Sequence, residues 1–311
     1  MIRKSGGVLL KIYTNLDNVT SYKTFKDMRK WQRERRKKVK DLTVNIEQCP
    51  SKKVLELNEN RSKTSYTWVG HSTFFIQMNG INILTDPVWA KRMGLEKRLT
   101  EPGLSLAELP EIDVVVISHG HYDHLDFPTL KKLPGNPQFF VPAGLKSLFN
   151  KKGYQKVVEM NWWESTEHSG ISFHFVPAQH WTRRSLKDIN TSHWGGWIFQ
   201  TPEETLYFVG DTGYFSGFKQ IAERFTIDTV FMPIGAFEPE WFMAPAHISP
   251  EDSVKAFSEL KARYFVPMHY GAYRLADDTG PEALERLIQE WETQQLPKEQ
   301  LKVLLLGETV F

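Results

Sequence analysis

Short apolar runs, several of them alternating with polar residues, recur along the chain from about residue 66 to its end. The stretch 72–87 predicts a β-hairpin, because Asn79 and Gly80 form the dipeptide that a type I′ turn favours and both flanks are rich in β-branched and aromatic residues. Residues 171–177 alternate as a half-buried strand does, whereas 114–117 are wholly apolar, as expected of a strand buried on both faces. Further strands are predicted at 195–201, 205–211, 229–235, 264–269 and 301–306.

Helices interrupt these strands only at intervals. An Asp-x-Pro start predicts a helix over 126–133, and Ser249 followed by proline and two acids predicts one over 250–260. A third helix is expected at 281–291. A chain dominated by strands in this way favours two sheets with helices outside them over a doubly wound parallel sheet, and therefore an α/β fold of the α+β type.

The first 62 residues differ from the rest and are predicted to be an N-terminal extension of a compact domain that spans 63–311. Residues 23–40 contain ten Lys or Arg and two acids, a net charge of +8. Because the whole chain carries only +2, the remainder is acidic at −6. This asymmetry points to an anionic partner for the extension.

The basic segment is also predicted to be an amphipathic helix. Its apolar residues Phe25, Met28 and Trp31 lie within an arc of about 120° at helical spacing, and charges occupy the other positions. Three interpretations stay open: the helix packs on its own protein, it contacts anionic lipid headgroups in a peripheral membrane contact through residues 23–40, or it binds nucleic acid.

Composition narrows the class of protein. With 311 residues, 41% hydrophobic and 24% charged, the chain has the make-up of a soluble globular protein with a large core. Its single cysteine, Cys49, excludes an intrachain disulfide and a thiolate metal cluster, and no run of 18 apolar residues is present. We expect a cytoplasmic protein, with the membrane contact above as an addition.

The stretch SHGHYDHLD, residues 118–126, places three histidines directly after a predicted buried strand. A core cannot bury this composition unpaired, and an ordinary solvated loop has no need of it. The spacing can give one cation two ligands, His119 and His121, and a neighbouring cation two more, Asp123 and His124. Imidazole and carboxylate together suit Zn, Fe and Mn, so the residue types do not choose among these metals.

The missing ligands have candidates elsewhere in the chain. His180, Asp211 and His269 each follow a predicted strand. A single histidine in such a place is usually a hydrogen-bonded structural residue, but seven potential ligands at strand ends predict a site for two metals.

HGHYDH resembles the HxHxDH signature of the metallo-β-lactamase superfamily, and the later His, Asp and His fall in its order. Over roughly residues 66–275 the chain more closely resembles the family of N-acylphosphatidylethanolamine-hydrolysing phospholipase D and its bacterial relatives, while the first 60 residues show no match. That resemblance rests on WVGHST, NILTDPVW, SHGHYDHLD, PAQHWTRR, WGGW, GDTGYF, PIGAFEPEWFM and AHISPEDSV.

The resemblance implies a four-layer αββα metallo-β-lactamase-like sandwich with its metals at one edge. One zinc would be held by His119, His121 and His180, and the other by Asp123, His124 and His269, with Asp211 bridging the two. His71, in WVGHST, is expected to support these ligands rather than join them.

Two such cations share a hydroxide, which is the expected nucleophile, and polarise a phosphoryl or carbonyl oxygen. Asp123 is predicted to orient that hydroxide as well as ligate. His247, close to the predicted helix start at Ser249, is the candidate to protonate or stabilise the leaving alkoxide, as the family position implies. Tyr214 and Arg183 are predicted substrate contacts, with packing for Tyr214 and plain solvation for Arg183 as the alternatives.

The leading hypothesis is a dinuclear zinc phosphodiesterase of phospholipase D type, acting on N-acyl phosphatidylethanolamine-like phospholipids or another small phosphodiester. The alternative is a lactonase or sugar-phosphate hydrolase similar to L-ascorbate-6-phosphate lactonase, because the same metal site serves several hydrolases. Nucleic acid is a disfavoured substrate, since no inserted nucleic-acid domain is visible between Asp211 and His269. A non-catalytic membrane- or partner-binding module is disfavoured by the intact ligand set, and a homodimer is compatible with the family.

Overall fold

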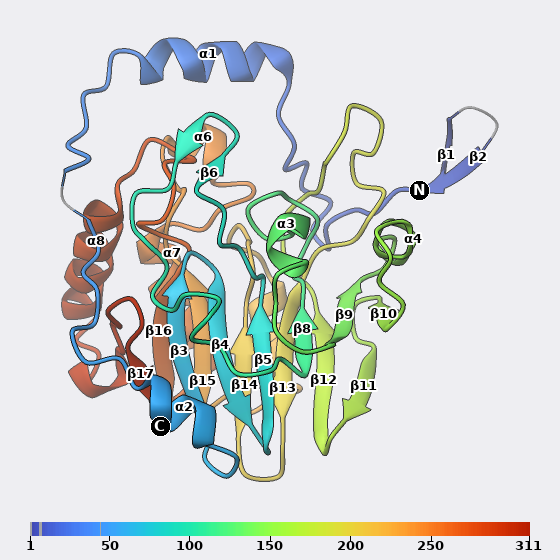
Figure 1. The fold of residues 1–311 in the computed structure, drawn as a ribbon. Helices are drawn as coiled ribbons and strands as arrows, with labels where there is room; N and C mark the ends of the chain where they lie inside the picture. The colour runs from blue at the N-terminus through green and yellow to red at the C-terminus, as the bar shows by residue number, and fades with distance from the viewer. Residues whose placement is uncertain (1, 6–7, 44) are drawn as a thin grey trace.

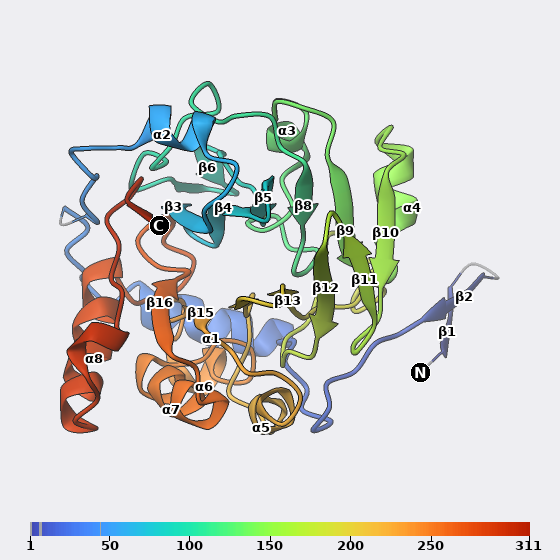
Figure 2. The same ribbon diagram turned by 90° about the horizontal axis from the view of Figure 1, so that it is seen from below.

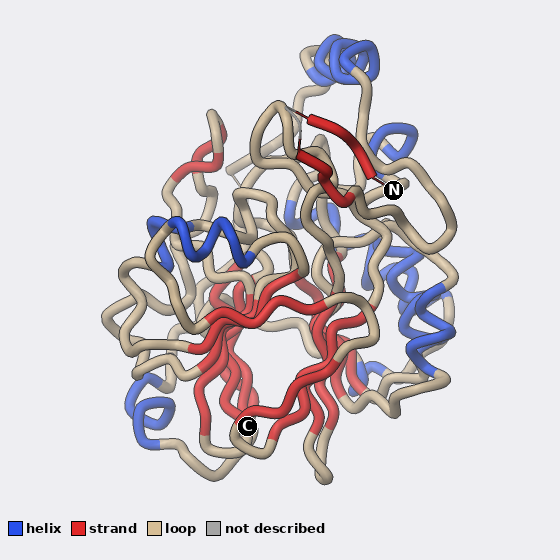
Figure 3. Tube along the Cα trace, turned by 90° about the vertical axis from the view of Figure 1, so that its right-hand side faces the viewer, coloured by secondary structure: helices blue, strands red, loops and turns tan. Residues whose placement is uncertain are grey.

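Two β-sheets face each other in a computed structural model that describes residues 2–5, 8–43 and 45–311. The seven-stranded sheet has the order β10-β9-β8-β5-β4-β3-β17, and the six-stranded sheet has the order β11-β12-β13-β14-β15-β16. Figures 1 and 2 show helices outside both sheets, so the described chain forms the predicted four-layer sandwich. Figure 3 shows the sheets as two facing, curved rows of strands.

The strands of the first sheet are β3 (Ser65–Gly70), β4 (Thr73–Met78), β5 (Ile81–Thr85), β8 (Val114–Val116), β9 (Gln138–Pro142), β10 (Val157–Met160) and β17 (Thr309–Val310). Those of the second are β11 (Ser165–His168), β12 (Ile171–Val176), β13 (Gly196–Gln200), β14 (Thr205–Phe208), β15 (Thr229–Pro233) and β16 (Tyr264–Met268). Each sheet contains a set of parallel strands beside an antiparallel meander. The parallel strands are β5, β8, β9 and β10 in the first sheet and β14, β15 and β16 in the second. The carboxyl ends of these parallel strands meet at one edge of the sandwich, the upper edge in Figure 1.

Aromatic and aliphatic side chains fill the space between the sheets, as the alternating runs predict, with Phe74, Phe173 and Trp197 fully buried. The outer face of the first sheet is covered by α2 (Val54–Glu59), α3 (Phe127–Leu130) and α4 (Lys146–Lys151). The second sheet is covered by α5 (Gly217–Ala222), α7 (Pro250–Leu260) and α8 (Gly280–Thr293). The shorter elements are α6 (Glu240–Met243), the hairpin of β6 (Arg92–Met93) and β7 (Glu96–Lys97), and a 3₁₀ turn at Lys298–Gln300.

Most predicted elements are confirmed. Asn79 and Gly80 join β4 to β5 with positive φ at both residues, as a type I′ turn requires. The side chain of Ser249 accepts a hydrogen bond from Asp252 N and caps α7, and Asp126 caps α3 in the same way. The helix predicted at 281–291 is α8.

The strand predicted at 301–306 is wrong. Only single bridges form there, from Leu301 to Phe265 and from Leu306 to Gln48. The reason is topological: this segment crosses from the edge of the second sheet to the edge of the first, where β17 then pairs with β3. Leu304 and Leu306 are therefore buried between elements without a ladder of backbone hydrogen bonds, whereas Val303 stays exposed.

The basic segment forms helix α1 (Phe25–Arg35), and this helix packs on its own protein. The indole of Trp31 stacks on Phe242 at 4.9 Å between ring centroids and donates a hydrogen bond of 3.0 Å to the buried carboxylate of Asp277. Lys38 lies 3.1 Å from the other oxygen of that carboxylate. Phe25, Lys26, Arg29 and Arg33 remain exposed on α1, whereas Arg35 turns inward and lies 3.8 Å from the carboxylate of Asp277.

The N-terminal region before α1 begins with a hairpin of β1 (Ile2–Ser5) and β2 (Val8–Lys11), which extends away from the sandwich in Figures 1 and 2. The sheets begin at β3, close to the predicted boundary at residue 63, and that boundary stays a prediction. Across the described ranges, none of the helices combines the length and the apolar character that crossing a bilayer requires.

Candidate metal centre

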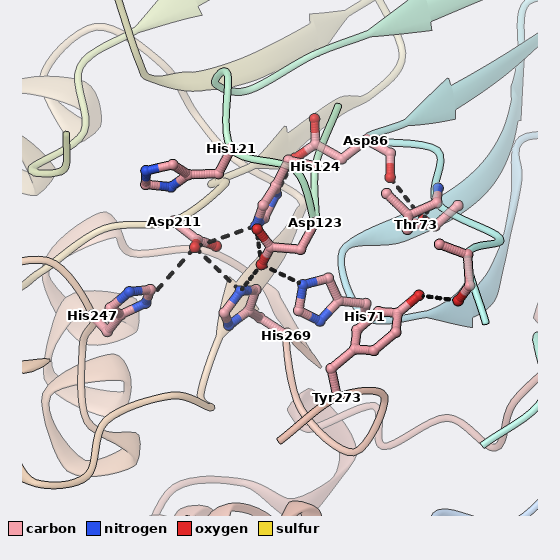
Figure 4. Close-up of polar contacts among 12 residues, drawn as sticks. His71, Thr73, Asp86, His121, Asp123, His124, Asp211, His247, His269 and Tyr273 are labelled. Carbon is pink, nitrogen blue, oxygen red and sulfur yellow. Dashed lines mark hydrogen bonds and ion pairs between the residues drawn. The ribbon is translucent and has the colours of Figure 1, made fainter. Parts of the chain in front are cut away.

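The predicted ligands come together at the upper edge of the sandwich, each just beyond the carboxyl end of a strand. Residues 119–124 follow β8, His180 follows β12, Asp211 follows β14 and His269 follows β16. Gly210, immediately before Asp211, has a φ of +69°, and a Cβ there would lie 2.7 Å from the Cβ of Ser118. Glycine therefore lets the end of β14 approach the start of the histidine loop. Figure 4 shows Asp123, His124, Asp211 and His269 converging from separate segments.

Three imidazoles form the first group. His119 Nε2 and His180 Nε2 lie 2.9 and 3.1 Å from His121 Nδ1. The Nδ1 of His180 lies 2.8 Å from the carbonyl of Ala246, so this nitrogen must donate and Nε2 has a free lone pair. Ser118 donates its hydroxyl proton to Asp86, so His119 Nδ1, 2.9 Å from Ser118 Oγ, must donate as well. Two nitrogen lone pairs therefore point at His121 Nδ1 from short range.

The second group combines imidazoles and carboxylates. Asp211 Oδ2 lies 3.3 Å from His124 Nε2 and 3.1 Å from His269 Nε2, and it lies 3.9 Å from His180 Nε2 in the first group. Asp123 Oδ2 lies 3.4 Å from His124 Nε2. Asp211 thus lies between the two groups, in the position that a bridging carboxylate would occupy.

These atoms fit metal ions. Buried polar atoms are normally hydrogen-bonded, yet His124 Nε2, His269 Nε2 and Asp211 Oδ1 are buried without a hydrogen-bond partner. Lone pairs that face one another at about 3 Å repel unless a proton or cation lies among them. The donor set, three nitrogens on one side and two nitrogens with two carboxylates on the other, suits two divalent transition-metal ions.

Burial sets the charge of the first group. It lowers the pKa of His119 well below the ordinary value, that of His121 to about 4 and that of His180 to about 3. All three imidazoles are therefore neutral at neutral pH, which is the form that ligates a metal.

The second group is held by charge pairing. Burial alone would lower the pKa of His269, but the carboxylates of Asp211 and Asp123 outweigh it and raise the pKa to about 9. Burial would raise the pKa of Asp211, but His124 and His269 hold it well below its usual range. Without a metal, the two carboxylates keep protons on these imidazoles, and a bound cation would displace those protons.

Two residues support the ligands from behind. The carboxylate of Asp86 lies just beyond β5 and accepts from Ser118 N at 2.7 Å and from His124 Nδ1 at 2.7 Å, which leaves Nε2 of His124 facing the site. His71 Nε2 lies 3.1 Å from Asp123 Oδ2, a contact that fits the supporting role predicted for His71. Sequence reasoning missed Asp86, although its place in LTDP at a strand end was a visible signal.

Arg184 stabilises the loop that carries the ligands. Its Nη1 donates to the carbonyls of Gly120 at 2.8 Å and Leu125 at 2.9 Å, and its guanidinium lies 4.0 Å from the ring centroid of Tyr122. Arg184 is therefore engaged by the protein itself, at the turn that presents His121 and Asp123.

The remaining predicted residues lie at different distances from the site. His247 is part of it, because its Nδ1 lies 3.7 Å from Asp211 Oδ2 (Figure 4). Arg183 lines the adjoining groove and donates through Nε to the carbonyl of Ser185. Tyr214 donates its hydroxyl to Glu259 of α7 at 2.7 Å, with Lys255 over its ring. The roles of all three stay predictions.

A groove of about 920 Å³ leads to the metal centre. His121 and Asp123 lie at its inner end, Met93, Trp181 and Leu186 form apolar walls, and Arg92 and Arg183 add positive charge. Two loops flank it: the β6–β7 hairpin and the loop 183–188. This combination suits a ligand with an anionic group and an apolar body.

Comparison with known proteins agrees with this geometry. The family model described as "Beta-lactamase superfamily domain" matches residues 81–270. The chain is 39% identical to N-acyl-phosphatidylethanolamine-hydrolyzing phospholipase D 1 of Caenorhabditis elegans over 67% of this chain and 64% of that protein. It therefore spans less than two thirds of that relative's length. It is 32% identical to a UPF0173 metal-dependent hydrolase of Polaromonas sp., over 72% of this chain and 84% of the relative.

Among solved structures, the novel metallo hydrolase Igni18 of Ignicoccus hospitalis superposes with a TM-score of 0.61 at 23% identity. The superposition covers 79% of this chain and 97% of that one, and it shows the same fold. With its strand order, its converging histidines and aspartates, and these matches, the chain belongs to the metallo-β-lactamase superfamily.

Proposed function

We propose that the chain is a phosphodiesterase of phospholipase D type that hydrolyses N-acyl phosphatidylethanolamine-like phospholipids. The observation that carries this proposal is the position of the metal centre at the inner end of a groove with apolar walls and cationic residues. A phospholipid has the matching parts, an anionic diester beside acyl chains. The name of the C. elegans relative supports the same substrate class.

We propose two zinc ions as the resident metals, held by the seven predicted ligands, with iron or manganese compatible with the same donors. When bound, such ions supply an activated water at neutral pH and take up charge from a phosphoryl oxygen. Asp123 lines the groove, and we propose that its carboxylate would ligate a metal and accept a hydrogen bond from the attacking water.

His247 is proposed to stabilise the leaving oxygen. Burial lowers its pKa to about 3, so the imidazole is neutral and acts as a hydrogen-bond donor rather than as a charged acid. Arg183 is proposed to contact the phosphate from the groove wall. A substrate contact by Tyr214 requires its hydroxyl to leave Glu259.

The loops beside the groove suggest how a lipid substrate would be reached. Leu95, at the turn of the β6–β7 hairpin, is 94% exposed, and Leu186 in the opposite loop is 87% exposed. Phe25 on α1 is 78% exposed beside the cations of that helix. We propose that these apolar side chains enter a lipid surface while Lys and Arg contact anionic headgroups.

Hydrolysis is tested with metal-replete protein and vesicles of N-acyl phosphatidylethanolamine, with products identified by mass spectrometry. The expected products are phosphatidic acid and an N-acylethanolamine, formed as water attacks phosphorus and the bond to the ethanolamine oxygen breaks. Turnover of lactones or sugar phosphates without any phosphodiester cleavage would reverse the proposal in favour of the alternative hydrolase.

The lipid contact is tested separately with Leu95→Asp and Leu186→Asp. Each variant should lose vesicle binding and vesicle turnover while it retains hydrolysis of a small soluble phosphodiester. Leu55→Asp is the matched control, because Leu55 is 80% exposed on α2, at the lower end of the sandwich in Figure 1. Equal losses on soluble and vesicle substrates would mean that the leucines shape the groove and do not contact lipid.

A further inference from the structure

The segment between β2 and α1 makes direct contact with a predicted metal ligand, although it lies outside the residues that match the family model. We call residues 13–21 the strap. Its Asn15 is 6% exposed, and its side-chain amide lies against the backbone of His180. In Figure 2 the strap is part of the blue chain that runs from the protruding hairpin toward α5.

Asn15 forms two hydrogen bonds with the peptide backbone of His180. The N–H of His180 donates to Asn15 Oδ1 at 3.0 Å, and Asn15 Nδ2 donates to the His180 carbonyl at 3.0 Å. His180 lies beyond the end of β12, where no strand ladder supplies these partners. A buried peptide must have both its donor and its acceptor satisfied, and the planar amide of Asn15 does this as a neighbouring strand would.

The same amide holds a second element. Trp194 Nε1 donates to Asn15 Oδ1 at 2.9 Å, and the indole of Trp194 is fully buried. Asn15 Nδ2 also lies 2.8 Å from the carbonyl of Val19 and 3.0 Å from Ser21 Oγ, so its two protons are shared among three acceptors and close the strap on itself. The position of the His180 backbone is therefore tied to a rigid aromatic residue and to a compact local turn.

Ser21 reaches the other side of the His180 side chain. Its Oγ donates to the carbonyl of Pro245 at 2.7 Å. The next residue, Ala246, provides the carbonyl that receives His180 Nδ1, and His247 follows. The strap thus contacts both the backbone of His180 and the loop whose Ala246 carbonyl receives Nδ1, which leaves Nε2 as the nitrogen that would hold a metal.

Asp17 anchors the middle of the strap to the domain. Its carboxylate accepts from the hydroxyl of Ser216 at 2.7 Å and from the backbone N–H of Ser216 at 3.2 Å, at the start of α5. The strap is therefore attached to the domain at several places, among them His180, Trp194, Pro245 and Ser216.

We propose that Asn15 is a positioning residue for His180 and that the strap is a working part of the metal centre. This inference rests on the proposed metal site. A ligand works only when its nitrogen is held at the right place, and partners behind a ligand commonly change metal affinity 10- to 100-fold when removed. The N-terminal region would then contribute to catalysis through the geometry of one ligand.

The test replaces Asn15 with leucine, which has a similar size and no hydrogen-bonding atoms. Metal equivalents retained by the full chain are measured in competition with a chelator, together with the Co²⁺ absorption spectrum and the melting temperature without metal. Asn15→Leu should lower the affinity for one of the two metal ions about 10- to 100-fold and alter the Co²⁺ spectrum. The affinity for the second metal ion should stay as in wild type. Asn45→Leu, at an exposed asparagine of the same region, should behave as wild type.

Wild-type affinity for both equivalents in a folded Asn15→Leu chain would overturn the proposal. So would an equal weakening of both equivalents in step with a lower melting temperature, since that is the signature of a general loss of structure. If Asn15→Leu fails to fold, Asn15→Asp decides: it retains the acceptor for His180 and Trp194 and loses the donor, so an intermediate loss at one equivalent is expected. No loss in Asn15→Asp overturns the proposal.

The result is separable from the proposed activity. If wild-type protein holds two metal ions but does not hydrolyse phospholipids, the phospholipase proposal is rejected. The metal affinities of the Asn15 variants then still decide the role of Asn15. Wild-type protein that holds no metal rejects both.

Discussion

Replacing Asp86 with asparagine tests how the second group of ligands is oriented. Three donors converge on this carboxylate: Ser118 N on Oδ1, and Ser118 Oγ and His124 Nδ1 on Oδ2. Burial raises the pKa of Asp86, and the bonds from His124 and Ser118 oppose that shift. Because all three partners have a proton to donate, the ionised carboxylate is the form that satisfies them.

Asparagine has one acceptor oxygen and cannot satisfy this arrangement. In one orientation its amide group faces the N–H of Ser118 and leaves a buried donor unpaired, at about 1–3 kcal/mol of folding free energy. In the other its amide donates to His124 Nδ1, so the proton of His124 moves to Nε2 and blocks the lone pair that faces the metal. Loss of a partner behind a ligand costs about 10- to 100-fold in metal affinity, or roughly 1.4–2.7 kcal/mol.

The assay is chelator competition for each metal equivalent, combined with urea denaturation of the metal-free chain. Asp113→Asn is the matched control, because the exposed Asp113 accepts a backbone N–H from Asn82 at the opposite end of β8. Asp86→Asn should weaken at least one equivalent by the stated factor, and Asp113→Asn should not. A stably folded Asp86→Asn protein with wild-type affinity for both equivalents would refute the reasoning.

Three further predictions follow from other contacts. Arg184→Ala should lower the free energy of unfolding, measured in urea, by about 2–3 kcal/mol, because its hydrogen bonds to backbone carbonyls are lost. Arg184→Lys should recover little of that stability because lysine lacks the planar guanidinium. Full recovery of stability in Arg184→Lys would contradict this role of the guanidinium. Trp31→Ala should release α1 and admit protease cleavage within residues 22–40 while the sandwich stays folded; resistance equal to wild type would mean that other contacts hold the helix. Burial raises the pKa of Asp278 to about 6. In the folded protein its carboxylate therefore takes up a proton at a higher pH than an ordinary aspartate does. As the pH falls from 7 to 5, the free energy of unfolding of wild type, measured in urea, should therefore rise by about 1 kcal/mol relative to that of Asp278→Asn. A difference between the two proteins that stays constant over this range would show that Asp278 is not protonated there.

The sequence was informative where local chemistry and burial agree. The Asn79–Gly80 turn, the Ser249 cap and the strands followed by a ligand each depend on residues that are close in sequence. These elements could therefore be predicted. The convergence of His180, Asp211 and His269 on the histidine loop was predictable because a buried imidazole or carboxylate at a strand end needs a partner.

The missed features depend on contacts between residues far apart in the chain. The stretch 301–306 reads as a strand because five of its six residues are apolar, but it crosses between two sheets and pairs only at single residues. Asn15 gives no signal of its own, since one asparagine in a polar segment is ordinary, and its role depends on a contact 165 residues away. The strap also means that an N-terminal truncation past residue 21 would disturb the metal centre, so such a truncation cannot isolate a membrane contact made by α1.

The central claim is that seven side chains hold two metal ions, and the most direct measurement is metal content per chain together with anomalous scattering from crystals grown with metal. We predict close to two ions per chain, one beside His119, His121 and His180 and the other beside Asp123, His124 and His269, with Asp211 next to both. Protein saturated with metal that carries no ion at these side chains, with their imidazoles turned away from one another, would contradict it.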